Sequence, residues 1–282
     1  MCNKTDISRR SFLKHSAVLG GAAATAVATS GLLTAPPEAE AAEDMSATFA
    51  ASRIIESEQY EDKTIVDIDL LIIGSGYAGM WAALTAAEQG VASIAMVDKG
   101  AIAQSSVASM TAGSTSFVLE DDDMYGCMEE LVKVSEFLSR QDFWEDMLST
   151  SPARYNKILS WGVNYLGDRI YSDGNTYTAI STGIEYQGKQ AGKAMIAALV
   201  DQVTAHGGIR YFSKTMVTQL LKEGESVVGA AGFNRINGNT IAFRSKATIL
   251  AAGKCSFKGQ HAMGEVETGD SYAMAYAAGA VL

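Results

Sequence analysis

The stretch Asp67–Gly100, DIDLLIIGSGYAGMWAALTAAEQGVASIAMVDKG, decides the fold of this chain. It opens with the apolar run Ile68–Ile73, broken only by Asp69, which is typical of a strand buried on both faces of a parallel sheet. The run Met80–Gln89 consists of good helix formers, and the apolar run Ala92–Val97 follows it. The order of these runs predicts a strand, a helix and a second strand.

Three glycines lie between the first predicted strand and the helix at G-x-G-x-x-G spacing. Gly74 permits a tight turn, Gly76 lets the backbone approach a pyrophosphate, and Gly79 lets the helix pack closely on the strand. Asp98, at the end of the second strand, is placed to accept a hydrogen bond from a ribose hydroxyl, while the helix N-terminus stabilises phosphate charge. The alternative is a βαβ unit whose glycines serve only turns. Because all five features occur in order, the sequence predicts dinucleotide binding.

The amino terminus has the pattern of an export signal. The residues Ser8–Lys14, SRRSFLK, match the twin-arginine motif, and a mildly apolar segment, Ala17–Ala35, precedes the small residues Ala39–Ala41. We expect cleavage after Ala41 and export by the twin-arginine route to the periplasm or to the outer face of the cytoplasmic membrane. An uncleaved membrane anchor is the alternative, but Gly, Ala, Ser and Thr dominate the segment, so its insertion is weakly favourable. Since this route carries folded proteins, we expect a cofactor to be inserted in the cytoplasm.

Composition narrows the range of partners. The formal net charge of −10 argues against nucleic acid or anionic lipid. Cys127 and Cys255 form no C-x-x-C motif, so no dithiol centre or c-type haem is encoded, although a disulfide between them is an alternative outside the cytoplasm. His206 and His261 are far apart in sequence, which argues against a metal site. We interpret Asp121–Asp123 as complementing a helix dipole rather than binding a metal.

The remaining sequence divides into a polar linker over residues 42–66, after the signal peptide of residues 1–41, and a domain over residues 67–282. We interpret the hydroxyl-rich residues 101–123 as lying along a cofactor ring, with a surface loop as the alternative. Helices are predicted over residues 124–139, 142–148, 151–160 and 189–205, and a polar surface segment over residues 167–188. Short strands are predicted over residues 210–221, 226–234, 240–243 and 246–251. The fold class is α/β, a three-layer Rossmann-like domain with a parallel sheet and a small antiparallel meander.

In combination, these motifs resemble the flavoprotein subunits of fumarate reductase and succinate dehydrogenase. The wider group includes L-aspartate oxidase, soluble flavocytochrome c fumarate reductases and the adenylylsulfate reductase flavoprotein. The similar stretches cover nearly all of residues 67–282 in family order: LLIIGSGYAGMWAALTAAEQG, the pair Asp98–Lys99, SSVASMTAG, WGV, VVGAAGFNRINGNTIAFRSKATILAAG and TGDSYAMAYAAGA. No single motif is decisive, but the series is specific.

The resemblance implies an FAD cofactor and assigns its contacts. It implies that the pyrophosphate is held by the glycine motif, namely Gly74, Ser75, Gly76, Ala78 and Gly79. It implies that the adenosine ribose is held by Asp98, with Lys99 beside it, and that the flavin lies along Ser105, Ser106, Ala112 and Gly113. It further implies adenine contacts from the backbone of Val217, a turn beneath the cofactor at Ala252 and Gly253, and a hydrogen bond to FAD from Asp270.

The sequence departs from the family pattern in two ways. Membrane-bound members carry a flavin-linked His where this chain has Ser106, so we expect non-covalent FAD. Ala112 and Lys254 replace glycines of the family motifs, which changes details of the contacts. The larger departure is that the family's capping domain, with its substrate-binding and proton-delivering residues, lies beyond the point that matches Leu282. We therefore assign no catalytic residue, and we expect an incomplete N-terminal part, without a capping domain, that is inactive alone.

Two classes of function follow. The first is an exported flavin-dependent reductase of anaerobic respiration, which transfers hydride to an activated C=C bond of a small-molecule electron acceptor. Its electron donor would be an extracytoplasmic cytochrome or quinol pathway, and a dehydrogenase or oxidase of the succinate or L-aspartate type is the close alternative. The second class is a non-catalytic, truncated FAD-binding fragment, which the DNA directly downstream would distinguish. A pyridine-nucleotide disulfide reductase is disfavoured because the sequence has no redox cysteine pair.

Overall fold

The computed structural model describes residues 55–111, 115–166, 170–171, 178–180, 183–256 and 267–281. All of them belong to one unit, which spans residues 51–282. The export signal, Ala112, Gly113 and His261 lie outside the described residues. None of the helices within the described ranges combines the length and the apolar character that a membrane crossing requires.

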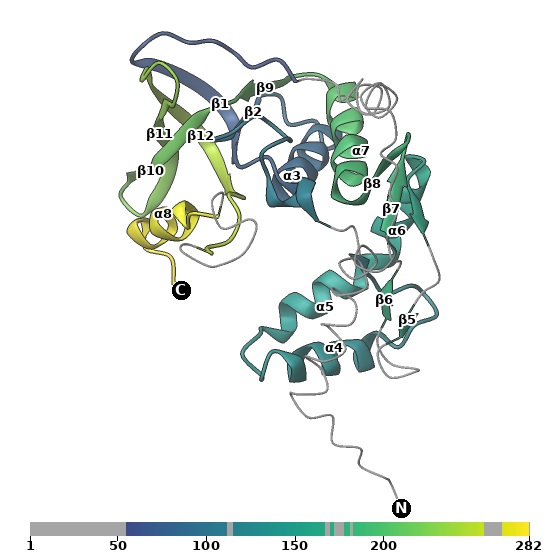
Figure 1. Ribbon diagram of the computed structural model, residues 1–282. Helices are drawn as coiled ribbons and strands as arrows, with labels where there is room; N and C mark the ends of the chain where they lie inside the picture. The colour runs from purple at the N-terminus through teal and green to yellow at the C-terminus, as the bar shows by residue number, and fades with distance from the viewer. Residues whose placement is uncertain are drawn as a thin grey trace, which may run out of the picture. The chain divides into compact units, whose positions relative to one another are not determined.

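A six-stranded mixed sheet organises the unit, in the order β10-β11-β12-β1-β2-β9 (Figure 1). Its strands are β1 (Thr64–Ile73), β2 (Ile94–Val97), β9 (Ile209–Phe212), β10 (Thr215–Glu223), β11 (Ser226–Asn234) and β12 (Thr240–Leu250). Strands β12, β1, β2 and β9 are parallel, whereas β10, β11 and β12 pair antiparallel. The predicted meander is thus part of the main sheet. Because β2 lies on one side of β1 and β12 on the other, the strand order reverses at the carboxyl end of β1.

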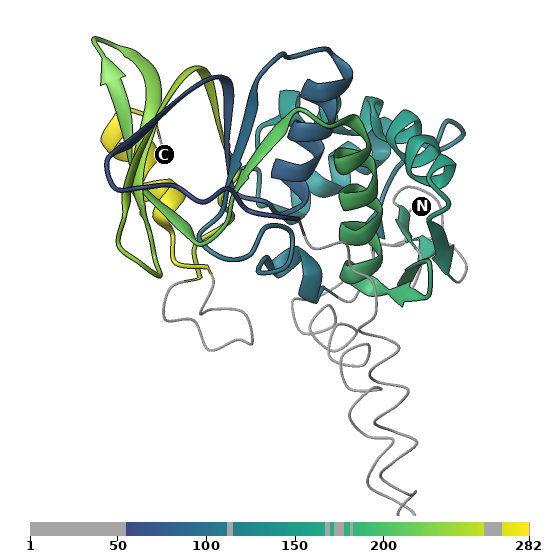
Figure 2. The same cartoon turned by 90° about the horizontal axis from the view of Figure 1, so that it is seen from above.

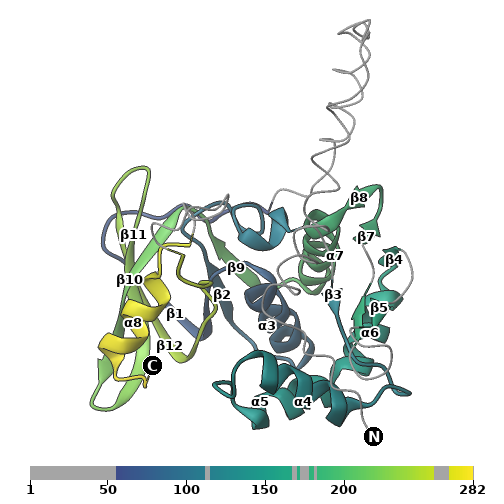
Figure 3. The same ribbon diagram turned by 60° about the horizontal axis from the view of Figure 1, so that its bottom comes forward.

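Helices cover both faces of this sheet, as Figures 2 and 3 show. Helices α3 (Tyr77–Glu88) and α7 (Ala191–His206) pack together on one face, and α8 (Asp270–Ala278) contacts β10 on the other. Alternate residues of β1 therefore enter different clusters: Ile72 packs towards the first face and Leu71 towards the second. This double burial explains why the β1 sequence is an apolar run rather than an alternating one.

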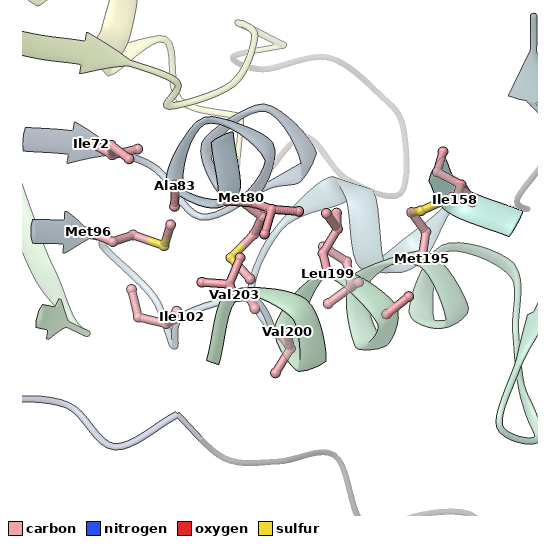
Figure 4. Packing of buried hydrophobic residues seen from close by; sticks show 14 of the residues in the cluster. Ile72, Met80, Ala83, Met96, Ile102, Ile158, Met195, Leu199, Val200 and Val203 are labelled. Atoms are coloured by element: carbon pink, nitrogen blue, oxygen red, sulfur yellow. The ribbon is translucent and has the colours of Figure 1, made fainter. Parts of the chain in front are cut away.

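The larger core lies between the sheet and the pair α3 and α7 (Figure 4). Met80 of α3 and Leu199 of α7 are fully buried and belong to the same cluster as Met96 of β2. Each such side chain contributes about 1.5–3 kcal/mol to folding by its burial. This packing fixes the direction in which α3 leaves the end of β1.

A long connection joins β2 to β9. It contains the short helix η1 (Val107–Met110), helices α4 (Met124–Val134), α5 (Gln141–Ser149) and α6 (Ser151–Ser160), and strands β3 (Thr115–Ser116), β4 (Asn164–Leu166), β5 (Ile170–Tyr171), β6 (Thr178–Ile180), β7 (Gly183–Tyr186) and β8 (Lys189–Gln190). The strands form two small sheets, β3-β6-β5 and β4-β7-β8. The ion pair of Lys157 with Glu88, at 2.6 Å, and the ring contact between Trp81 and Trp161 hold α6 against α3.

Several boundaries differ from the sequence prediction. Strand β1 begins at Thr64, inside the predicted linker, and its Asp67 pairs across the sheet with Arg244 of β12 at 2.7 Å. The predicted strand over 210–221 is two strands, because Lys214 adopts a φ of 55° and turns the chain. The two strands predicted over 240–243 and 246–251 are one continuous strand, β12. The predicted helix over 124–139 ends at Val134.

Residues 57–60, which we call the N-terminal strap, also lie within the predicted linker but contact β9. The backbone N–H of Glu58 donates to the carbonyl of Tyr211 at 2.7 Å. Its carboxylate accepts two hydrogen bonds from Arg210, at 2.7 and 2.6 Å. The N–H of Ser213 donates to the Ser57 hydroxyl at 2.9 Å. The folded unit therefore begins before β1.

Candidate cofactor-binding site

A cavity of about 360 Å³ lies at the carboxyl ends of β1, β2 and β12, where the strand order reverses. Open α/β sheets bind ligands at this type of position. Most of the residues that the sequence analysis selected line it: Gly74, Ser75, Gly76, Ala78, Asp98, Lys99, Ser105, Ser106, Val217, Ala252, Gly253 and Asp270. Gly79 lies outside this lining, beneath the turn, and Ala112 and Gly113 lie outside the described residues.

The three glycines of the motif differ in the space that a side chain would find at each position. Gly74 has a φ of 107°, and a Cβ there would lie 2.3 Å from the carbonyl oxygen of Ala251. A Cβ on Gly79 would lie 1.9 Å from the carbonyl oxygen of Gly74. At Gly76 the nearest atom would be Cβ of Ser106, at an ordinary 3.7 Å. The protein's own packing thus requires two of the glycines, while the third leaves open space at the cavity.

The N-terminus of α3 faces this cavity with its backbone donors. Gly76 is the N-cap, no side chain caps it, and the first turn contains no acidic residue. The first N–H groups of a helix have no intrahelical acceptor, and the helix dipole places partial positive charge beside them. The arrangement suits a phosphate group.

Asp98 is held in place by Ser75 from the neighbouring turn. Its Oδ2 accepts from the Ser75 N–H at 2.9 Å and from the Ser75 hydroxyl at 2.6 Å, and its Oδ1 accepts from the Gly100 N–H at 2.7 Å. The Ser75 hydroxyl in turn accepts from the Ala103 N–H at 2.8 Å. A carboxylate has about four acceptor sites, so Asp98 retains capacity for a ribose hydroxyl.

Lys99 joins the end of β2 to the start of α8. Its ammonium donates to Asp270 at 2.8 Å and to the Thr268 hydroxyl at 2.5 Å, and that hydroxyl also donates to Asp270. Burial raises the pKa of the Asp270 carboxyl, but the hydrogen bonds from Lys99 and Thr268 outweigh this effect, so the pKa lies below its ordinary value. Asp270 is therefore ionised at neutral pH.

The hydroxyl of Ser106 is buried and has no hydrogen-bond partner among the described residues. Such groups are rare in folded proteins, because an unmade buried hydrogen bond costs about 1–3 kcal/mol. Ser106 lines the cavity. A ligand with a polar edge at this position would supply the missing partner. Together with the α3 N-terminus and Asp98, this donor and acceptor set suits the pyrophosphate, ribose and ring of an FAD.

Sequence reasoning missed several residues of the lining, including Tyr77, Thr215 and Met274. Thr215 is buried, and its N–H donates to the carbonyl of Asp98 at 2.9 Å. Thr215 stands two positions before Val217 on β10, and alternate residues of a strand share a face. The selection of Val217 could therefore have led to Thr215. Tyr77 is the variable position between Gly76 and Ala78, and the motif gave no reason to select it.

Tyr60 of the N-terminal strap contacts the lining residue Thr215. Its hydroxyl lies 3.0 Å from the Thr215 hydroxyl. Burial raises the pKa of Tyr60, and hydrogen bonds with Thr215 and Asn234 offset only part of that effect. The phenol is thus neutral and able to fix the Thr215 side chain.

Residues weighed for other chemistry have structural roles. Asp123 caps α4 by accepting from the Gly126 N–H at 2.9 Å, in line with its interpretation as a helix-terminus residue. Cys127 is buried and Cys255 is exposed, and neither forms a disulfide in the described structure. Within the described ranges, no group of three or more His, Cys, Asp and Glu side chains is placed to hold a metal ion.

Comparison with known proteins gives one family match over the domain and a second match at the amino terminus. The family described as FAD binding domain matches residues 69–282, and the twin-arginine translocation (TAT) pathway signal sequence matches residues 6–26. The chain is 30% identical over 239 residues to a subunit of the fumarate reductase (CoM/CoB) of Methanothermobacter marburgensis, a match that covers 81% of this chain and 42% of that protein. It is 25% identical over 224 residues to L-aspartate oxidase 2-a of Nicotiana tabacum, covering 76% and 34%.

Among solved structures, the fold is similar to that of the Mycobacterium smegmatis Sdh1 complex in the apo form. The TM-score is 0.65 at 22% identity, with 77% of this chain and 39% of that chain covered. At this identity the likeness concerns the fold alone. The chain spans about two-fifths of the length of the curated relatives it matches.

Proposed function

Because this chain belongs to the FAD binding domain family of the fumarate reductase and succinate dehydrogenase flavoproteins, we propose that it holds the FAD of an exported, flavin-dependent reductase. The twin-arginine signal indicates the export route. The proposed substrate is a small molecule with an activated C=C bond, and the proposed electron donor is an extracytoplasmic cytochrome or quinol pathway. The proposed attachment of FAD is non-covalent, because Ser106 stands where some family members carry the linking His.

The observation that carries the proposal is the pairing of an uncapped α3 N-terminus with Asp98 at one cavity. The glycine turn brings backbone N–H groups to the position of a diphosphate. Asp98, fixed by Ser75, stands at the end of the adjacent strand, where a ribose hydroxyl would donate to it. This combination recognises a dinucleotide rather than an isolated anion.

The bound FAD supplies hydride transfer, and the chain's residues hold and shield it. The N–H groups of α3 would hold the pyrophosphate, and the Ser106 hydroxyl would donate a hydrogen bond to the ring edge. The Ala252–Gly253 turn is tied to α8 by the Ser271 hydroxyl, which donates to the Gly253 carbonyl at 2.9 Å. Apolar side chains of Val97 and Met274 line the same cavity and would shield a bound cofactor from water. We assign no proton donor to any residue of this chain.

The same cofactor site would serve the reverse reaction. A dehydrogenase or oxidase of the succinate or L-aspartate type is thus the alternative, and the similarity to L-aspartate oxidases keeps it open. A non-catalytic FAD-binding chain is the alternative of another class. The substrate and the direction of the reaction belong to the proposal, since this chain spans only part of its relatives.

A two-part experiment tests these alternatives. The purified chain is first titrated with FAD, and we expect saturable quenching of flavin fluorescence that excess NAD does not reverse. Absence of binding would overturn the proposal. The loaded protein is then mixed with reduced viologen and fumarate-like or enone acceptors, or with an oxidising dye and succinate or L-aspartate. Acceptor-specific reoxidation supports the reductase, and dye reduction supports the reverse reaction. Binding without turnover agrees with an FAD-binding part that is inactive alone.

A further inference from the structure

Helices α4 and α5 form an antiparallel hairpin that leaves large apolar side chains in solvent. The two helices lie side by side in Figures 1 and 3. Their inner side buries Cys127, Val132 and Leu148. The turn between them and its flanks carry the exposed apolar side chains Val134, Phe137, Leu138 and Phe143, which with the acidic residues around them we call the acidic hairpin face. An apolar group of this kind with a polar rim is typical of an interaction site.

The end of the hairpin is built to present two of these side chains. Glu136 and Phe137 have φ values of 55° and 62°, which residues other than glycine rarely adopt. The Phe137 N–H donates to the Val132 carbonyl at 2.9 Å. Ser139 is held by the Ser135 hydroxyl at 2.6 Å and by the Trp144 indole N–H at 2.9 Å. The turn is thus fixed by local contacts, while Phe137 is 73% and Leu138 is 87% exposed.

Charge is concentrated around the same side chains. Residues 119–149 contain ten acidic and two basic residues, a net charge of −8 in a chain whose total is −10. Both basic residues are paired within the hairpin: Lys133 with Glu129 at 2.7 Å, and Arg140 with Asp142. The positive charges of this segment are therefore already neutralised locally. The hairpin attracts basic surfaces over a distance of about a Debye length.

We propose that the acidic hairpin face docks a separate protein whose contact surface is basic at its rim and apolar at its centre. A second copy of this chain fits poorly, because a symmetric contact would oppose two faces of the same negative charge. An anionic membrane is disfavoured for the same reason. Opposite charge on the partner instead speeds its encounter, and the apolar centre then slows its release. This proposal does not depend on the proposed FAD function.

The test uses a probe of the stated chemistry, a fluorescein-labelled amphipathic helical peptide with lysines on one face and leucines on the other. A peptide with the same lysines but glutamines in place of the leucines is the matched probe. Fluorescence anisotropy with the full chain should show binding of the leucine peptide that weakens as salt rises, and binding of the glutamine peptide that is about ten-fold weaker. Equal binding of both peptides would overturn the proposal, since charge alone would explain it.

Variants locate the binding on the hairpin. The double variant Phe137→Ser, Leu138→Ser should weaken binding of the leucine peptide about ten-fold. The control Ile236→Ser, at a side chain 74% exposed in the β11–β12 turn, should leave binding unchanged. The charge variant Asp121→Asn, Asp146→Asn should slow association, and its control Glu223→Gln, Glu225→Gln should not. Matching far-UV circular dichroism verifies that each variant is folded.

Three results would contradict the proposal. If the Phe137→Ser, Leu138→Ser variant and the Ile236→Ser control bind equally well, the hairpin is not the site. If sedimentation shows a dimer of the full chain that the double variant loses, a second copy occupies the face. If the full chain binds phosphatidylcholine vesicles and the double variant does not, the occupant is a lipid surface.

Discussion

The ammonium of Lys99 lies 2.8 Å from the carboxylate of Asp270, 171 positions later in the chain. This contact closes one side of the cavity by joining the carboxyl end of β2 to the first turn of α8. Helix α8 makes few other polar contacts with the parallel strands among the described residues, apart from the Ser271 bond to Gly253. The pair therefore couples the position of α8 to the cofactor site.

Replacing Asp270 by Asn should lower stability by about 1 kcal/mol at neutral pH, because a partly exposed ion pair is lost. The folded-state pKa of Asp270 is lowered, so its contribution is complete above the ordinary pKa of about 3.9 and disappears as the pH falls through the folded-state value. The difference in Tm between wild type and variant should thus shrink below about pH 4. Thermal melts across this range measure it. A difference independent of pH would show that the charge of Asp270 contributes nothing.

The glycine motif offers a matched pair of variants. Gly76→Ala should change stability by no more than about 1 kcal/mol, since its φ of −73° is accessible to alanine although glycine is preferred at an N-cap. The added methyl should weaken FAD binding, because it occupies the space beside the α3 N–H groups. Gly79→Ala should instead destabilise the fold by about 1–3 kcal/mol or more, because its Cβ would meet the Gly74 carbonyl. Denaturant unfolding and FAD titration separate the two effects. Normal FAD affinity in Gly76→Ala would contradict the assignment.

Ser106→Ala should have opposite consequences for the free and the FAD-loaded protein. Without FAD it removes a buried hydroxyl that has no partner among the described residues, so stability should be unchanged or raised by about 1 kcal/mol. With FAD it should remove a hydrogen bond and reduce the stabilisation that the cofactor gives. Melting curves with and without FAD provide the comparison. An equal FAD-induced shift in Ser106→Ala and wild type would argue against contact with the cofactor.

Acid precipitation of the flavin-loaded protein should release the flavin to the supernatant. The expected result follows from Ser106, which has no imidazole to form a bond with the ring. Absorbance of supernatant and pellet measures the distribution. Yellow colour that stays with the denatured pellet would refute non-covalent binding.

The variant Arg9→Lys, Arg10→Lys should accumulate in the cytoplasm, because the twin-arginine route reads that pair. FAD loading should be unaffected, since the described cavity contains no residue of the signal. Cell fractionation followed by flavin analysis tests both statements. Equal export of the variant would contradict the assigned route.

The sequence predicted the elements whose signals are local. The apolar run of β1, the glycine turn and the acid at the end of β2 all depend on a few neighbouring residues, and the structure brings Gly76 and Asp98 to one cavity. The predicted α6 and β11 also have their expected bounds. Each of these elements is delimited by a turn residue or by a clear change of period.

Features that depend on distant partners were not predictable. Thr64–Val66 fall in the predicted linker because their pairing partners, Ile241–Phe243 of β12, lie far away in the sequence. Lys214 follows the end of β9, and Phe137 follows the end of α4, each in a left-handed conformation. No glycine or proline at these positions indicates the change of direction. In the site, Met274 lines the cavity because α8 docks beside β10. Tertiary contacts set these positions, and a single sequence does not display them.

The N-terminal strap has a protective effect on a protein that crosses a membrane already folded. The outermost parallel strand of a sheet exposes backbone groups that can recruit a strand from another chain. Here the Glu58 N–H donates a hydrogen bond to the Tyr211 carbonyl, and the ion pair of Glu58 with Arg210 places charge along the same edge of the sheet. We therefore expect the strap to hinder pairing of this edge with another chain while the folded protein is exported.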